Sequence, residues 1–400
     1  MELPRRIGAV GDPPQPGHPV EQGTDPGLRL GGGGLGGARG RRRWVHAAAV
    51  HVVPARAGDG PAPPARPGVV DQLHRRPRRR RPGAAARRRA RARLRGGAGG
   101  ALRAAPPHRS LLVHEAGVAA LLTWGERHRR DLPWRRSRDP WAVLVSELML
   151  QQTQVPRVVA RYEGFLARFP TPTGCAAAAA GDVVRAWAGL GYNRRAVNLH
   201  RAACAMVEQH EGRVPDELDA LLTLPGVGPY TARAVLVFAF ERDLGLVDTN
   251  AGRFVARAGA GRRLDAREAQ AVADSLVPSG RAWEWGQAVF DLGALVCTRR
   301  DPACGRCPVA DHCAWQSAGR PDPDPVTGSA GIAGPQSTFA GSDRQGRGRL
   351  VDALRRGPVA SARAADVAGW PGDPGRAQRV VEQLVADGLA RVEGDELSLP

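Results

Sequence analysis

The stretch from Leu221 to Phe254 reads LLTLPGVGPYTARAVLVFAFERDLGLVDTNAGRF and decides the fold of this chain. One apolar helix ends before LPGVGP at 224–229, and a second is predicted from about Tyr230 to Phe240. The two glycines allow a tight helix–turn–helix whose backbone can approach a ligand closely. The first amides of the second helix would then point outward, which favours phosphate binding. The same glycines are also compatible with an ordinary helical hairpin.

Two acidic residues stand out in apolar surroundings. Asp248 follows the second helix in VDTN at 247–250, and Glu147 lies within SELMLQQT at 146–153. Burial would raise the pKa of Glu147 and keep it protonated near neutral pH, which makes it a candidate general acid. The alternative is a solvated acid on the polar face of its helix. Across a cleft, the two carboxyl groups would resemble the acid and stabiliser of glycosidic bond cleavage.

Four of the six cysteines lie close together near residue 300. They read Cys297-x6-Cys304-x2-Cys307-x5-Cys313, in a segment that also contains prolines. Zinc sites favour two Cys-x2-Cys pairs at longer separation, whereas one close pair between two wider steps fits a [4Fe-4S] cluster better. Unliganded core thiols are the remaining interpretation. The other two cysteines, at 175 and 204, are predicted to be ordinary buried thiols.

The net charge of +19 is unevenly distributed. Residues 1–108 hold 22 Arg and 6 acids, or +16, and the remainder holds 36 Arg and 33 acids, or +3. A DNA-binding face on the folded part must therefore be local. All 58 basic residues are arginine, so the chain offers no lysine for chemistry.

The chain divides into four regions by composition. Residues 1–108 are rich in Arg, Gly, Pro and Ala and are predicted to be disordered, either as a basic arm that adds DNA affinity or as the product of a spurious start site. Residues 109–318 show helical periodicity and few alternating segments, which predicts an all-α body. Residues 319–337 are predicted to be a linker, and 338–400 a small separate module.

The helices are expected near 111–126, 141–151, 155–168, 181–188, 194–210, 216–223, 230–240, 266–275 and 284–296. In the last module, three short helices at 349–356, 359–368 and 373–387 precede two strands around a turn at 393–395. That order is typical of a winged helix, which would either touch DNA or only pack against the body. No run reaches transmembrane length, and the apolar segment 44–53 lacks the features of an export signal.

Taken together, LPW at 132–134, SELMLQQTQV at 146–155, GLGYNRRAVNLH at 189–200, LPGVGPYTA at 224–232, VDTN and the four cysteines resemble the A/G-specific adenine DNA glycosylases of the MutY type. These belong to the helix-hairpin-helix superfamily, and the resemblance covers about residues 111–318. It implies a helical glycosylase core with a [4Fe-4S] cluster domain, acting on double-stranded DNA with adenine opposite 8-oxoguanine or guanine. It also implies a monomer in the bacterial cytoplasm, associated with the nucleoid and not with a membrane.

The resemblance assigns a role to each matching residue. Glu147 would protonate adenine, Asp248 would stabilise the sugar cation, and Tyr230 and Asn250 would orient them. Residues that would enter the duplex or line the pocket for the flipped adenine are Arg130, Trp134, Leu150, Gln152, Thr153, Tyr192 and Gln287. The phosphate-binding hairpin would comprise Leu224, Gly226, Val227, Gly228 and Thr231. The cluster ligands would be Cys297, Cys304, Cys307 and Cys313.

One position separates this chain from the related bifunctional enzymes of the endonuclease III type. Those carry a lysine nucleophile where this chain has Tyr230, so a monofunctional glycosylase is expected. Two other functions stay open from the residues alone. One is a glycosylase for thymine or uracil opposite guanine, and the other is an iron–sulfur DNA-binding regulator without catalysis. The winged-helix module replaces the Nudix-like domain of the best-known relatives, so the preferred base opposite adenine is not predicted.

Overall fold

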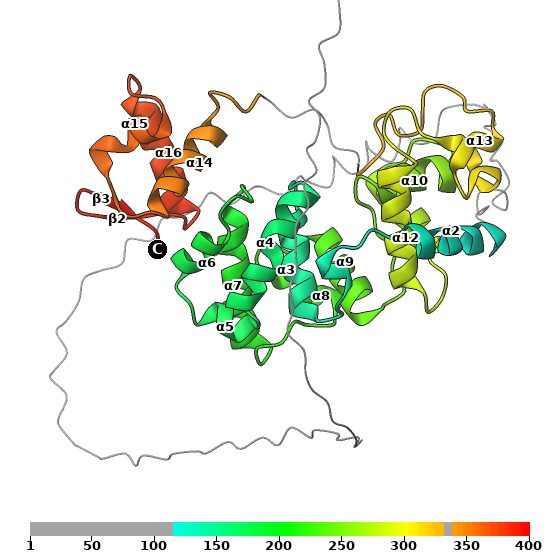
Figure 1. Cartoon of the computed structure of the whole chain (residues 1–400), viewed down its shortest axis with the longest axis horizontal. Coiled ribbons are helices and arrows are strands. Elements are labelled where there is room, and N and C mark those ends of the chain that lie inside the picture. Colours follow the sequence, from blue (N-terminus) through cyan, green and yellow to red (C-terminus); the bar gives the residue numbers. More distant parts are fainter. Residues whose placement is uncertain (1–114, 332–337) are drawn as a thin grey trace, which may run out of the picture. The chain divides into compact units, whose positions relative to one another are not determined.

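The computed structural model describes residues 115–331 and 338–400, and these belong to one compact unit. The predicted disorder of residues 1–108 lies outside the described residues. Figure 1 shows a helical body followed by a small mixed module. The helices of the body are α2 Glu115–His128, α3 Pro140–Leu150, α4 Val155–Arg168, α5 Pro172–Ala176, α6 Ala180–Ala186, α7 Arg194–Gln209, α8 Leu218–Thr223, α9 Pro229–Phe240, α10 Ala251–Phe254, α11 Ala266–Ser275, α12 Ala282–Leu295 and α13 Ala314–Ser317.

Shorter turns connect these helices. They are the 3-10 helices η1 Pro133–Arg135, η3 Cys304–Arg306 and η4 Ala310–His312 and the π-helix η2 Val255–Ala260. The predicted helices agree with the observed ones to within a few residues, which confirms the all-α body, whereas the short helices α5, α10 and α13 were not predicted. The start expected at 111 lies partly outside the described residues. No helix in the described part of the chain is long and apolar enough to span a membrane.

Two hydrophobic clusters organise the body. The first surrounds α3, whose residues Trp141 to Met149 are all buried, because α4, α7 and α9 pack around it. The second lies between α2, α10, α11 and α12. The ring of Phe238 on α9 packs edge-on against Phe290 on α12, with centroids 5.8 Å apart. Through this contact α9 of the first cluster packs against α12 of the second, and the loop that follows α9 carries Asp248.

The C-terminal module forms the predicted winged helix, with corrections at the starts of two helices. Its helices are α14 Asp343–Leu354, α15 Ala364–Ala368 and α16 Pro374–Ala386, and its strands are β1 Val359–Ala360, β2 Arg391–Glu393 and β3 Glu396–Ser398, with η5 Ser361–Arg363 between β1 and α15. The antiparallel sheet has the order β1-β3-β2. The helix expected over 349–356 begins earlier, at Asp343. The helix expected over 359–368 is wrong at its start. Val359 pairs with Leu397 instead, because the sheet supplies backbone partners that a helix there would forgo.

The linker predicted at 319–337 is also partly wrong. Residues 332–337 lie outside the described part, but the segment before them packs on the second cluster. Val326 and Ser329 are buried, and the amide of Ala330 donates to the carbonyl of Leu264 at 3.0 Å. Asp324 pairs with the buried Arg257 at 2.6 Å. Polar composition misled the prediction because these contacts come from distant residues.

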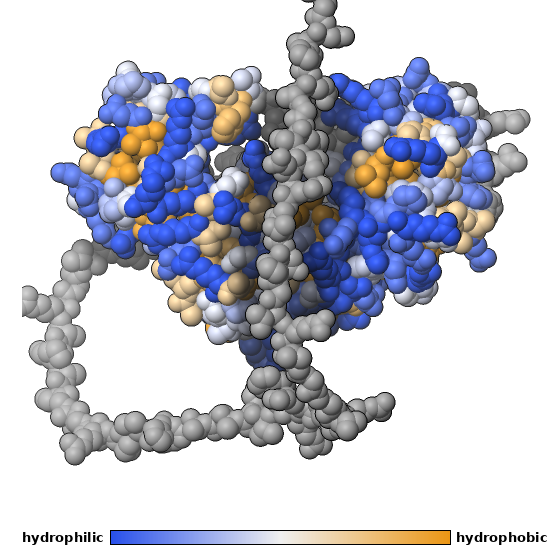
Figure 2. All heavy atoms as spheres, viewed as in Figure 1, coloured by the Kyte–Doolittle hydropathy of each residue, from blue (hydrophilic) through white to orange (hydrophobic). Residues whose placement is uncertain are grey.

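The surface drawn in Figure 2 is mainly hydrophilic, and its hydrophobic residues lie in small separate patches. Among the described residues, the most exposed large hydrophobic side chains are Phe339 and Val392, both in the C-terminal module. Scattered apolar residues of this kind are normal on a folded surface and do not by themselves mark a binding site.

Candidate active site

Glu147 lies one turn before the end of α3 and is only 6% exposed. Its helix begins cleanly because Asp139 accepts a hydrogen bond from the amide of Ala142 at 2.7 Å. Burial raises the pKa of Glu147 to about 7, and the negative charge of Asp248 adds to the shift. A hydrogen bond with Tyr230 acts in the opposite direction. Near neutral pH, a large fraction of Glu147 therefore carries a proton it can donate.

Asp248 lies in the loop after α9 and is half-buried. One carboxylate oxygen accepts hydrogen bonds from the amides of Asn250 at 2.8 Å and Ala251 at 2.6 Å. The other accepts from the side-chain amide of Asn250 at 3.0 Å. These donors favour the anion, and they belong to the start of α10 rather than to the hairpin. Burial nevertheless outweighs these hydrogen bonds and raises the pKa of Asp248 above its ordinary value.

Tyr230 and Asn250 each touch one of the two acids. Tyr230, at the start of α9, bonds to Glu147, and burial raises the pKa of its hydroxyl well above the usual value, so it stays a donor. Asn250 holds Asp248 as described above. The structure thus brings together four residues from α3, α9 and the loop before α10. The arrangement can supply a proton at one point and a negative charge nearby.

The hairpin between α8 and α9 has the expected backbone shape. Gly226 adopts φ +82°, and a Cβ there would meet Asn198 at 2.8 Å, so only glycine fits. The amide of Val227 donates to the carbonyl of Leu224 at 3.1 Å, so these two residues shape the turn. Thr231 is buried, and its hydroxyl contacts the side-chain amide of Gln151 at 3.2 Å. At Gly228, the space around Cα is open to a ligand.

The residues expected to enter DNA lie on two neighbouring loops. Gln152 and Tyr192 adopt φ values of +54° and +45°, and Tyr192 is 42% exposed. Thr153 lies between the loops, because its hydroxyl contacts the carbonyl of Leu190 at 3.3 Å. Non-glycine residues in this conformation are uncommon and cluster at functional positions.

Arg195 holds these two loops together and was not predicted. Its buried guanidinium donates to carbonyls of both loops, including those of Gln151 at 2.5 Å and Gly191 at 3.0 Å. It also donates to the hydroxyl of Thr153 at 2.8 Å. Arg195 is the second arginine of GYNRRAVN and directly precedes the apolar Ala196 and Val197, so the sequence offered only a weak signal. Its role depends on carbonyls supplied by α3, more than 40 residues away.

The four residues expected to line an adenine pocket come from three elements. Trp134 in η1 packs edge-on against Tyr162, with centroids 5.7 Å apart, and Leu150 ends α3. Gln287 on α12 is 5% exposed. Arg130 does not stand free, because its Nε donates to Asp291 at 2.6 Å. Asp291 lies one helical turn beyond Gln287, so this ion pair supports the side of the predicted pocket.

A second buried acid was missed by the sequence. Asp291 is 0% exposed and accepts two hydrogen bonds from Arg135, at 2.7 and 3.0 Å, in addition to that from Arg130. Arg135 also donates to the carbonyl of Arg130 at 3.1 Å. The acid within the apolar sequence QAVFDLGAL was the available signal. Without knowledge of its partners, it could not be distinguished from Glu147.

Arg253, also missed, connects the Asp248 loop with the cysteine segment. Its guanidinium donates to the Asn250 side chain at 2.8 Å and to the carbonyls of Thr249 and Gly293, both at 2.5 Å. Its Nε donates to the carbonyl of Cys297 at 2.8 Å. One buried cation therefore satisfies acceptors just before α10, on α12 and in the loop that follows α12.

The four clustered cysteines surround one apolar cavity of about 30 Å³, lined in addition by side chains such as Phe254, Leu292 and Trp315. Within residues 115–331 and 338–400, no group of three or more His, Cys, Asp or Glu side chains is arranged to hold a single metal ion. Four thiols around one cavity fit a multi-iron cluster, whose sulfur ligands surround the iron atoms instead of converging on one. Of the other two cysteines, Cys175 is buried as predicted, but Cys204 is partly exposed.

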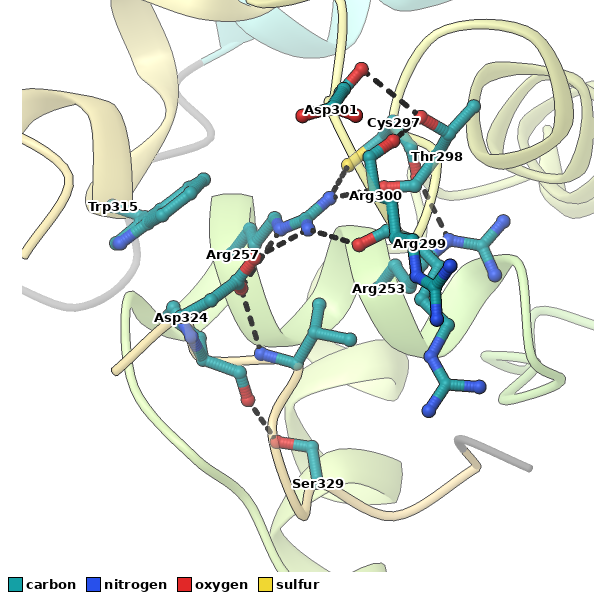
Figure 3. Close-up of polar contacts among 12 residues, drawn as sticks. Arg253, Arg257, Cys297, Thr298, Arg299, Arg300, Asp301, Trp315, Asp324 and Ser329 are labelled. Atoms are coloured by element: carbon teal, nitrogen blue, oxygen red, sulfur yellow. Dashed lines mark hydrogen bonds and ion pairs between the residues drawn. The ribbon is translucent and has the colours of Figure 1, made fainter. Parts of the chain in front are cut away.

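Figure 3 shows Arg257 beside the first of these cysteines. Its guanidinium approaches the Cys297 sulfur at 3.4 Å and the carbonyl of Thr298 at 2.7 Å. The opposite edge pairs with Asp324. Because the arginine is 1% exposed, its charge acts on the sulfur through a poorly solvated environment. A cation there would stabilise a thiolate, the form that binds iron.

Comparison with known proteins defines the class. Residues 145–279 match the HhH-GPD superfamily of base excision DNA repair proteins, and residues 297–313 match the iron-sulfur binding domain of endonuclease III. The chain therefore belongs to the helix-hairpin-helix base excision repair proteins and carries a [4Fe-4S] cofactor. The solved structure of a thermostable thymine-DNA glycosylase aligns with 50% of this chain and 95% of that chain, with 29% identity and a TM-score of 0.47.

Full-length relatives define the family more narrowly. The chain is 43% identical over 279 residues to the adenine DNA glycosylase of Mycolicibacterium smegmatis, covering 69% of this chain and 92% of that protein. It is 44% identical over 290 residues to that of Mycobacterium tuberculosis, covering 70% and 92%. The human adenine DNA glycosylase is 39% identical over 208 residues, covering 48% and 38%. This chain is a member of the adenine DNA glycosylase family.

Proposed function

We propose that this protein excises adenine from DNA duplexes in which adenine lies opposite 8-oxoguanine or guanine. The observation that carries the proposal is the pairing of Glu147 and Asp248 in one buried site with different partners. Glu147 has a pKa of about 7 and contacts Tyr230, whereas Asp248 accepts three hydrogen bonds. A dissociative cleavage of an N-glycosidic bond needs one proton donor and one anion.

In the proposed reaction, Glu147 donates its proton to N7 of the flipped adenine. The bond between adenine and C1′ breaks, and its electron pair leaves with the protonated base. Asp248 stabilises the sugar cation, either as an ion partner or through a transient covalent bond, until water adds at C1′ and its proton passes to the Glu147 carboxylate, which restores the acid. Hydrogen bonds from Asn250 and the α10 amides hold the Asp248 carboxylate in one orientation. The hydrogen bond with Tyr230 orients Glu147.

The base must leave the duplex before these groups can reach it. We propose that Gln152, Thr153 and Tyr192 fill the space it vacates, since their loops are held together by Arg195. Arg130, Trp134, Leu150 and Gln287 would line the pocket for the flipped base. Gly226 and Gly228 would let the hairpin approach a phosphate, with Leu224, Val227 and Thr231 holding its shape.

The composition of the chain predicts that the protein excises the base without using a lysine to cleave the strand. The chain contains no lysine, and Tyr230 stands where the related lyases carry one, so no lysine can form a Schiff base with the sugar. We propose that Cys297, Cys304, Cys307 and Cys313 hold the cluster, which supplies a fixed fold for residues 297–313. We also propose that the protein acts as a monomer at the bacterial nucleoid, where its substrate lies.

The test is incubation of the purified protein with duplexes that carry each mispair, followed by alkali to reveal abasic sites. We expect breaks at adenine opposite 8-oxoguanine and guanine, and no breaks before alkali. Excision of thymine or uracil opposite guanine would overturn the proposed substrate. That outcome is worth testing because a thymine/uracil-DNA glycosylase of Methanothermobacter thermautotrophicus is 30% identical over 203 residues.

A further inference from the structure

The C-terminal module makes specific contacts with the helical body. The body includes residues 189–194, which form the Tyr192 loop. The amide of Gly181 on α6 donates to the terminal carbonyl of Pro400 at 2.8 Å, and Leu399 is buried. Arg194 on α7 pairs with Asp387 at 3.2 Å. A Cβ on Gly181 would lie 2.5 Å from the Pro400 oxygen, so the backbones approach more closely than any larger residue allows.

Arg355 extends from the end of α14 into this contact. Its Nη2 donates to the side-chain oxygen of Asn193 at 2.8 Å, and its Nε donates to the carbonyl of Val184 at 3.0 Å. Nη1 pairs with Asp352, which lies at the solvent side. The arginine side chain is only 10% exposed, so all three donor positions are directed by protein acceptors.

Asn193 directly follows Tyr192 and occupies the N-cap position of α7, where its side chain makes no capping hydrogen bond. The same loop is held from the inside by Arg195 and by Trp187, whose indole donates to the carbonyl of Gly191 at 3.3 Å. Arg355 adds the contact from the module. Because Tyr192 adopts a left-handed conformation, its backbone depends on such surrounding contacts to stay in place.

The charge of the module favours this internal role over direct DNA binding. Residues 338–400 contain 9 Arg and 9 Asp or Glu, so the module has no net charge. Its wing carries the exposed acids Glu393, Asp395 and Glu396, which phosphates would repel. A neutral module with an acidic wing is suited to packing on its own chain.

We propose that Arg355 is a positioning residue, through which the winged-helix module holds Asn193 and so orients the Tyr192 loop for entry into DNA. This rests on the role proposed above for Tyr192. The module then contributes to recognition of the mispair without touching the nucleic acid. The effect of Arg355 passes through one hydrogen bond to Asn193, the residue next to Tyr192, and is separate from the ion pair between Arg194 and Asp387.

The first experiment measures hydrogen exchange of residues 189–194 in the DNA-free protein. Arg355→Met, which keeps the apolar stem and removes the donors, should raise exchange there about tenfold, as expected for loss of one charge-assisted hydrogen bond. The matched control Asp352→Asn removes only the solvent-side pair and should leave exchange unchanged. Equal effects of both variants would overturn the proposal. Because no substrate is present, the result stands even if the protein fails to excise adenine.

The second experiment measures binding to an adenine:8-oxoguanine duplex at several salt concentrations. Arg355→Met should weaken binding about tenfold, with the excision rate at saturating enzyme changed less than about twofold. The slope of log affinity against log salt should not change, because no phosphate contact is lost. A slope reduced by about one would show that Arg355 contacts DNA itself and would overturn the positioning role.

A double-mutant cycle separates positioning from general docking. If Arg355 acts through Asn193, Arg355→Met should have little further effect on duplex affinity in an Asn193→Ala background. Additive effects would show that the module stabilises the body without directing the loop. Gly181→Ala, which displaces the C-terminus, serves as a second way to weaken the docking and should also raise exchange at 189–194.

Discussion

Two buried carboxyl groups in this protein have opposite surroundings. Glu147 on α3 is 6% exposed, contacts Tyr230 and lies near the negative charge of Asp248. Asp291 on α12 is 0% exposed and is paired with Arg130 and Arg135 through hydrogen bonds of 2.6 to 3.1 Å. Both acids lie in apolar helices, so the local sequence pattern does not distinguish one from the other.

The difference shows that the surroundings of a buried carboxyl group determine its role. Without a cation, burial makes the carboxylate costly, so the group holds a proton near neutral pH and can donate it. With two arginines, the charge is neutralised where it lies, and the pair joins η1 to α12. The arrangement at Glu147 lowers the stability of the fold but supplies a proton donor. The arrangement at Asp291 holds two elements of the structure together.

The largest effect expected is on catalysis. Glu147→Gln keeps the shape and removes the transferable proton, so excision of adenine should fall at least about a thousandfold. Binding to an adenine:8-oxoguanine duplex should change little. Single-turnover assays with the exposed control Glu208→Gln measure this. Excision by Glu147→Gln at the rate of the control would show that another group protonates the base.

Asp248→Asn should also slow excision, by roughly a hundredfold to a thousandfold, because it removes the anion that stabilises the sugar cation. The neutral amide can still accept from Asn250 and Ala251, so the loop should keep its structure. Single-turnover excision and binding of the same duplex measure the two effects. Loss of binding in parallel with excision would contradict this separation.

Replacement of the other acid should affect folding instead. Asp291→Asn leaves Arg130 and Arg135 buried without a negative partner, and should lower the free energy of unfolding by about 3–5 kcal/mol. Denaturant unfolding measures it, with Asp131→Asn in the exposed pair with Arg136 as a control that should show no measurable change. Normal stability of Asp291→Asn would break the comparison between the two acids.

Replacement of Glu147 should change the free energy of unfolding in the opposite direction to replacement of Asp291. Its pKa lies at about 7 in the folded state against an ordinary 4.5, so the folded state binds its proton more tightly than the unfolded state. Stability is therefore lost as pH rises from about 4.5 through 7, by up to about 3 kcal/mol. Glu147→Gln should remove this loss and be more stable than the unmodified chain at pH 8. Thermal unfolding at pH 5 and pH 8 tests it.

A smaller effect concerns the pH dependence of excision. The rate should decline above about pH 7 as Glu147 loses its proton. Tyr230→Phe removes the hydrogen bond that lowers this pKa, so the decline should move to higher pH. Rates measured between pH 6 and 9 compare the two proteins. A decline at the same pH in both would mean that Tyr230 does not act on Glu147.

The smallest effect should follow removal of residues 1–107. These residues carry most of the excess arginine but none of the partners of Glu147 or Asp291 among the described contacts. A chain that starts at His108 should excise adenine at an unchanged rate, with weaker non-specific DNA binding at low salt. Unfolding of the shortened chain would show that this region contributes to the fold.

The sequence by itself determined the elements whose signals are local. Helical periodicity predicted α3, α4, α9 and α11 closely, and the LPGVGP turn predicted the hairpin, because a tight turn restricts which residues fit. Cysteine spacing predicted the cluster segment, because the ligands of one cluster are close along the chain. The absence of lysine excluded a lysine nucleophile without any structure.

Only the tertiary structure decided which buried charges have partners. Arg135 and Asp291 are 156 residues apart, and Arg355 and Asn193 are 162 apart, so no local pattern relates them. The direction of the Asp248 pKa shift depends on how burial balances its hydrogen bonds, which sequence cannot weigh. Pairing and desolvation are set by neighbours that folding brings together, and these determine whether a buried acid reacts or supports the structure.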